Sequence, residues 1–162
     1  MAVTTNTATV RGVDVAPSAV GDASQEVVIS RTVELAASDS SSTITFCRIP
    51  SNARITGLSR IYWDDLATSG SPTLDIGLFA VNSNVTSDDD ALNDGLALSA
   101  VSTAGIGSPV VKDIANYGLP AWDHVANVTA DPGGFLDVKG TVRDAPTNAA
   151  GTVTLELRYF PG

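Results

Sequence analysis

The sequence is poor in the residues that carry most enzyme and metal chemistry. It has one cysteine, Cys47, and one histidine, His124. An intrachain disulfide is therefore excluded, and a catalytic triad or a zinc site would depend on a single imidazole. Cys47 lies in a mostly apolar run, which favours a small buried side chain, while Arg48 should point to the opposite face. His124 follows bulky Trp122 closely, which favours packing at the surface or half-buried.

Basic residues are also scarce. Nine basic and eighteen acidic residues give a net charge of −9, and no basic stripe that would bind nucleic acid is present. No apolar run approaches the length of a membrane span, and the N-terminus has no features of a secretory signal. We therefore expect neither a nucleic-acid partner nor a membrane. Lys112 and Lys139 are the only lysines; the arginines suit ion pairs, either between strands or at an interface.

Sequence motifs of catalysis are missing as well. The chain has no nucleophile elbow, no phosphate-binding loop and no dinucleotide fingerprint. We therefore predict a protein that is not an enzyme, with no catalytic residue, no cofactor and no metal.

Two acidic segments are candidate binding sites. Asp88, Asp89 and Asp90, with Asp94, could offer oxygen ligands to calcium, but Leu92 falls at a ligand position in either register of an EF-hand loop. Helix capping and solvation are the favoured interpretation.

The second acidic segment is Trp63-Asp64-Asp65. Paired carboxylates beside an aromatic ring could form a sugar site. An aromatic residue that ends a strand and acids that begin a loop favour a structural role instead.

What the sequence does contain is alternation with a period of two. In residues 151–160, Val153, Leu155, Leu157 and Tyr159 fall on one face, and polar residues fall on the other. This pattern is typical of a strand with one buried and one solvated face. It predicts strands over residues 26–35, 43–49, 54–63, 73–81, 96–101, 135–143 and 151–160.

The connections complete the predicted architecture. Residues 26–35 and 43–49 are expected to form a hairpin across a polar turn. Residues 87–95 suggest one helical turn, with Ser87 as its cap and Gly95 at its end. Residues 110–117 and 120–126 fit short helices or extended links.

These elements predict an all-β fold, an antiparallel two-sheet sandwich with a jelly roll as the favoured topology. The sandwich domain is residues 25–162. Residues 1–24 are predicted to be an extended N-terminal arm that contacts a partner or a neighbouring subunit instead of its own sandwich. The candidate partner-contact residues in this arm are Val10, Arg11, Val13 and Val15.

Five stretches together resemble a family of small structural proteins of tailed bacteriophages, of the capsid decoration or cement type. The stretches are residues 48–57 (RIPSNARITG), 61–65 (IYWDD), 74–79 (LDIGLF), 88–95 (DDDALNDG) and 130–135 (ADPGGF). The resemblance covers about residues 26–160 and leaves the arm outside.

The resemblance implies a virion protein that binds the major capsid protein on the exterior of the capsid, as a homotrimer, after assembly in the host cytoplasm. It carries no catalytic residues. Two alternatives remain open: a virion spike, fibre or tail adsorption module that binds host glycans, and a free-standing carbohydrate-binding domain.

Overall fold

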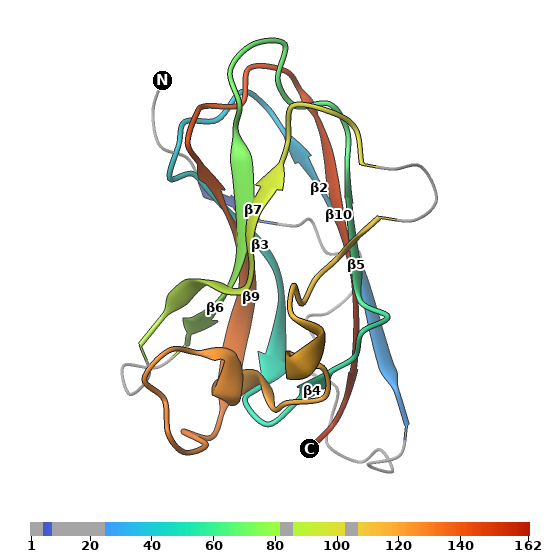
Figure 1. Ribbon diagram of the computed structural model, residues 1–162, viewed down its shortest axis with the longest axis vertical. Helices are drawn as coiled ribbons and strands as arrows, with labels where there is room; N and C mark the ends of the chain where they lie inside the picture. The colour runs from blue at the N-terminus through green and yellow to red at the C-terminus, as the bar shows by residue number, and fades with distance from the viewer. Residues whose placement is uncertain (1–4, 8–24, 82–85, 103–106) are drawn as a thin grey trace.

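The computed structural model of the chain describes residues 5–7, 25–81, 86–102 and 107–162 (Figure 1). This part is built from strands and two short 3₁₀ helices, η1 and η2. The elements are β1 (Thr5–Thr7), β2 (Val27–Leu35), β3 (Thr43–Pro50), β4 (Arg54–Ile55), β5 (Arg60–Trp63), β6 (Thr73–Ala80), β7 (Asp88–Ala97), β8 (Ser108–Pro109), η1 (Ile114–Asn116), η2 (Ala121–His124), β9 (Phe135–Arg143) and β10 (Gly151–Phe160).

The strands form two sheets that face each other (Figure 1). Sheet A has the order β1-β3-β9-β6-β7, and sheet B has the order β2-β10-β5-β8, with β4 also paired to β10. Every named pairing is antiparallel except that of β1 with β3. The predicted all-β, two-sheet sandwich is therefore confirmed.

The strand pairs are nested along the chain. β6 pairs with β7, β5 with β8, β3 with β9, and β2 with β10. The outermost pair thus joins β2 to β10. The arrangement is that of one long hairpin that is rolled up, so that successive strand pairs fall alternately in sheet A and sheet B. This is the order of a jelly roll, the topology that the sequence favoured.

The core lies between the two sheets and is built by alternate residues of each strand. In β10, Val153, Leu155, Leu157 and Tyr159 are all fully buried, which confirms the register predicted for the last strand. The largest buried side chains come from both sheets and from the loops between them: Tyr159, Leu35, Ile44, Ile49, Ile55, Ile61, Leu66, Leu74, Ile76, Leu78, Leu98 and Leu136.

The hairpin expected between residues 26–35 and 43–49 is wrong. β2 pairs with β10 in sheet B, while β3 pairs with β9 in sheet A. The polar loop between them therefore carries the chain from one sheet to the other. Its backbone is held to the last part of the chain by Ser38 and Thr147, whose amides and carbonyls bond each other at 3.2 and 2.9 Å. Turn residues show where the chain changes direction, but they do not show which strands will pair with each other.

The helical turn expected at residues 87–95 is also wrong, because this segment lies in strand β7. The strand pairs with β6 through two irregularities in register. Gly95 has a φ of +77°. This left-handed conformation is common at the end of a helix, but here it occurs within an irregular strand. The Gly95 amide donates to Asp75 at 2.9 Å. Pairing with β6 therefore overrides the local capping pattern.

Residues 54–63 form two strands rather than one. A turn over residues 56–59 separates β4 from β5, and Gly57 lies directly against the ring of Tyr117, where a Cβ would overlap the ring. The predicted parity still holds, since Ile55, Ile61 and Trp63 are buried. The strand expected at residues 96–101 is reduced to the end of β7, whereas residues 110–117 and 120–126 do contain the short helices η1 and η2.

Part of the predicted arm returns to its own sandwich. Thr5 to Thr7 form β1, which adds a parallel edge strand beside Thr43 to Thr45 of β3. For these three residues the expectation that the arm leaves its own domain is wrong. Backbone hydrogen bonds to the β3 edge explain the attachment, because an edge strand offers unpaired amides and carbonyls.

Candidate functional site

The residues that could have carried thiol or imidazole chemistry are enclosed by the fold. Cys47 is buried on the inner face of β3, and Arg48 faces outward and pairs with Asp137 at 2.7 Å. Both placements agree with the sequence analysis. Such burial favours an inert structural thiol over a reactive one.

His124 ends η2 and is half-buried, as predicted. Neither ring nitrogen has a hydrogen bond of good geometry among the described residues. Burial lowers the pKa of His124, and the Asp123 carboxylate and the Leu119 carbonyl oppose this shift only in part. The folded protein therefore favours the neutral imidazole.

The acidic stretch of β7 brings three of its four carboxylates together. One carboxylate oxygen from each of Asp88, Asp89 and Asp90 lies within 4.8 Å of the others, while Asp94 lies outside this group and faces Lys112 at 3.8 Å. Asp88 accepts a hydrogen bond of 2.8 Å from the Ala126 amide. Asp89 forms an ion pair with Arg143, which also donates to Asp75 at 3.1 Å.

The contacts set the protonation of this group. Burial alone would raise the pKa of Asp88, but hydrogen bonds from Asp90 and from the Ala126 amide lower it overall. The hydrogen bond with Asp88 is the main cause that raises the pKa of Asp90, with burial and carboxylate repulsion adding to it. Two of the three acids are thus engaged by protein donors, whereas calcium requires six to eight oxygen ligands. The geometry indicates a structural and solvated role.

The Trp63 segment also has structural contacts. Trp63 is buried and its indole donates to the Ala100 carbonyl at 2.9 Å, so its ring face is not available for a sugar to stack on. Asp64 accepts bonds of 2.7 and 2.8 Å from the amide and hydroxyl of Thr152, and these lower the pKa of Asp64. Asp65 accepts from the Ala67 amide at 3.2 Å. The structural interpretation preferred from the sequence agrees with these contacts.

The candidate arm residues Val10, Arg11, Val13 and Val15 lie outside the described residues. Their predicted contact with a partner therefore stays a prediction.

One surface was not found by the sequence analysis. On the outer face of sheet B, Val28 of β2 stands opposite Arg158 of β10, and Arg54 of β4 stands opposite Phe160. Arg60 of β5 lies beside the same strand, opposite Glu156. The sheet B patch is defined as Val28, Arg54, Arg60, Arg158 and Phe160, together with Leu58, which lies in the turn between β4 and β5.

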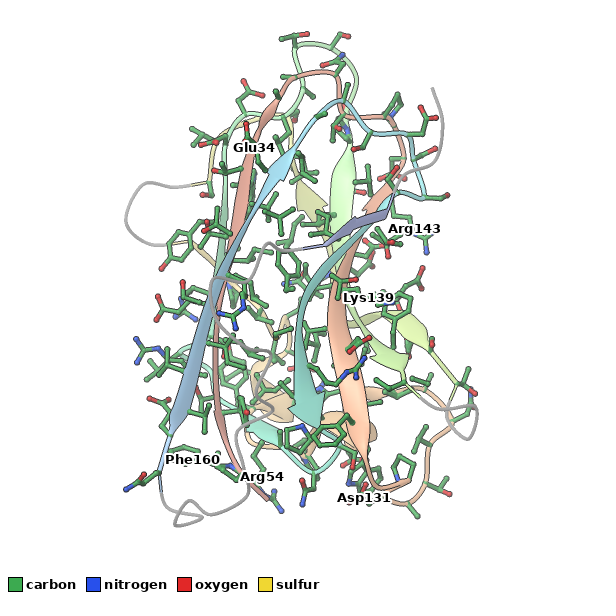
Figure 2. All side chains as sticks on the ribbon, turned by 180° about the vertical axis from the view of Figure 1, so that it is seen from behind. Glu34, Arg54, Asp131, Lys139, Arg143 and Phe160 are labelled. Atoms are coloured by element: carbon green, nitrogen blue, oxygen red, sulfur yellow. The ribbon has the colours of Figure 1, made fainter. Side chains whose placement is uncertain are left out.

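The sheet B patch combines exposed apolar side chains with arginines. Val28 is 50% exposed, Leu58 60% and Phe160 36%. Figure 2 shows Arg54 and Phe160 at the same end of the sandwich. Arginine and aromatic residues such as Phe160 are enriched where proteins meet one another, and lysine is depleted there. The only sequence signal was the preference for arginine over lysine, which did not show where the arginines would gather.

Sheet B also has an open edge. Within the described ranges β2 pairs with β10 on one side and with no strand on the other. Arg31 points inward from this edge strand, beside Leu155, and is half-buried. A charged residue on the inner face of an edge strand disfavours simple strand addition. The exposed face of sheet B is therefore a better candidate for contacts than its edge.

Comparison with known proteins finds two phage capsid structures with this fold. A chain of the cyanophage Pam1 capsid asymmetric unit matches with a TM-score of 0.55 and 20% identity, over 85% of each chain. A chain of the Ralstonia phage GP4 capsid matches with a TM-score of 0.57 and 23% identity, over 86% of each chain. At this identity the likeness establishes a shared jelly-roll fold.

The other comparisons add no family. No protein-family model matches the chain, and no curated protein sequence is similar to it. Among the described residues, no helix has the length and apolar character needed to span a bilayer.

Proposed function

We propose that this chain is a non-enzymatic decoration (cement) protein of a bacteriophage capsid, which binds the shell of the major capsid protein and stabilises the head. The observation that carries the proposal is the jelly-roll fold shared with chains of two phage capsid structures over most of the chain. The five sequence stretches that resemble phage decoration proteins point the same way. In this proposal the protein assembles in the host cytoplasm, acts as a homotrimer and lies on the capsid exterior.

The physical properties of the fold support such a role. A decoration protein must remain folded without disulfides and must stay soluble before it meets the shell. The sandwich buries a continuous apolar core, and the net charge of −9 causes repulsion between free copies.

The direct test adds purified protein to heads of its phage that lack it. Electron cryo-microscopy should then show additional density on the outer surface of the shell, and the heads should break at a higher temperature than undecorated heads. Density on the tail, or binding on a glycan array without binding to heads, would instead support the adsorption module. Unchanged heads and no glycan signal would contradict both.

The predicted contact of the arm with a partner allows a sharper test. A triple variant, Val10→Ser/Val13→Ser/Val15→Ser, leaves β1 and the sandwich unaltered in sequence. It should melt within about 2 °C of the wild type, because every residue of the apolar core of the described sandwich is kept, yet bind heads at least about tenfold more weakly. Equal binding by the variant and the wild type would remove the arm from the proposal.

A further inference from the structure

The sheet B patch has an unusual charge for this chain. Its three arginines belong to a protein with twice as many acidic as basic residues. Arg158 is already paired with Glu156 at 2.6 Å and more loosely with Glu26 at 3.5 Å. These two glutamates offset part of the positive charge of the patch, so the charge available to a partner is that of Arg54 and Arg60.

Two of the arginines have no carboxylate partner in the described part of the chain. Arg54 donates to the Gly118 carbonyl at 2.8 Å. Arg60 donates to the carbonyls of Gly57 and Ser59 at 2.6 and 2.9 Å. These bonds hold each guanidinium in place, and they leave further donors of its planar fork for a carboxylate from outside.

A complementary surface exists on the other sheet. The β7 ridge is defined here as Asp88, Asp89 and Asp90, which begin the last strand of sheet A. Asp90 is exposed. Arg143, the partner of Asp89, lies at the opposite edge of the molecule from Phe160 in Figure 2. The patch and the ridge are therefore different surfaces of one chain.

We propose that the sheet B patch binds the β7 ridge of a second copy of this chain, in a head-to-tail contact. The exposed carboxylate of Asp90 would meet Arg54 or Arg60, since Asp88 and Asp89 already have partners in their own chain. The exposed apolar side chains of Val28, Leu58 and Phe160 would supply the dry centre of the contact. Apolar anchors are needed, because exposed ion pairs alone contribute little free energy.

The head-to-tail arrangement has a geometric consequence. Each added copy leaves one free patch and one free ridge, so the contact repeats until a ring closes. A ring of three copies would satisfy all patches and ridges at once. The inference therefore deepens the proposed homotrimer and rests on it only for the number of copies.

The test measures self-association of the full chain by sedimentation equilibrium at about 0.15 M salt, where the repulsion between copies of charge −9 is partly screened. The wild type should show a concentration-dependent mass above the 16.6 kDa of one chain. Arg60→Glu should raise the dissociation constant at least about tenfold. Val28→Glu should do the same without removing any side-chain hydrogen bond.

A matched control separates the patch from net charge. Arg48→Glu makes the same change in charge on sheet A and should alter the dissociation constant less than about threefold. The charge swap Arg60→Glu/Asp90→Arg should restore most of the lost affinity, because it re-creates an opposite pair across the contact. Circular dichroism melts would verify that each variant is folded.

Several outcomes would overturn the inference. These are a wild type that stays monomeric at about 100 μM, equal loss in Arg48→Glu, or unchanged association in both patch variants. Binding to heads is measured separately. Head binding by a monomer, lost in the patch variants, would assign the patch to the shell and refute self-docking while leaving the decoration role intact. Self-association without head binding would refute the decoration role alone.

Discussion

Replacement of Leu155 by alanine tests which face of β10 is buried in the core. Leu155 is completely buried in the middle of β10, with Arg31 of β2 on one side and Ile61 of β5 on the other. Leucine-to-alanine changes in protein cores cost about 2–5 kcal/mol, and the cost rises when the surroundings cannot collapse into the cavity. Because hydrogen-bonded strands hold β10 on both sides, we expect about 3–5 kcal/mol.

Thermal and urea unfolding, followed by circular dichroism, would measure this cost. A chain of this size loses about 2–4 °C of melting temperature per kcal/mol, so Leu155→Ala should lower it by about 6–20 °C. The control is Thr154→Ala on the adjacent, outward position, whose hydroxyl bonds that of Thr32 at 2.8 Å. It should cost about 0.5–1 kcal/mol. If the two variants melted alike, the assignment of inner and outer faces in β10 would be refuted.

Three further predictions follow from single residues. Burial raises the pKa of Tyr159 to about 12, and its hydroxyl has no hydrogen-bond partner among the described residues. Tyr159→Phe should therefore leave the urea midpoint unchanged or raise it, and a loss above about 1 kcal/mol would show that the hydroxyl has a partner. A Cβ on Gly77 would overlap the backbone of Asp88 and Asp89, so Gly77→Ala should cost more than about 2 kcal/mol in the same assay, and a neutral effect would contradict the close approach of β7. Because burial lowers the pKa of His124 in the folded state, the unfolded chain takes up this proton at a higher pH. The melting temperature should therefore be highest above about pH 6.5 and fall below it, and His124→Gln should reduce that fall; an unchanged pH profile in the variant would exclude His124 as a cause.

The local alternation of polar and apolar residues was sufficient to predict which face of a strand is buried. A period of two reports which side of a strand meets water, and this property depends on each residue's own side chain. It placed Leu155 and Leu157 inside, Arg48 outside and Cys47 in the core, and all four agree with the structure. The scarcity of thiols, imidazoles and catalytic motifs likewise needs no structure to recognise.

The local sequence led to a wrong prediction at residues 87–95, where the same residues are compatible with a helix and with a strand. Ser87, the following aspartates and Gly95 can cap and end a helix, yet Asp89 instead pairs with Arg143 and Gly95 donates to Asp75. Both partners are distant in sequence, so no window around residue 90 contains the interaction that decides between helix and strand. The energy of pairing with β6 exceeds the small local preference.

The sequence by itself determined the composition, the alternation and hence the class of a two-sheet sandwich. Only the tertiary structure decided that β2 joins β10 and β3 joins β9, because strand partners are chosen by burial shared between segments that are far apart along the chain. The same nesting brought Val28, Arg54 and Phe160 onto one face. A surface assembled from three separate strands has no signature in any one of them, because the sequence records neighbours along the chain and the fold creates neighbours across it.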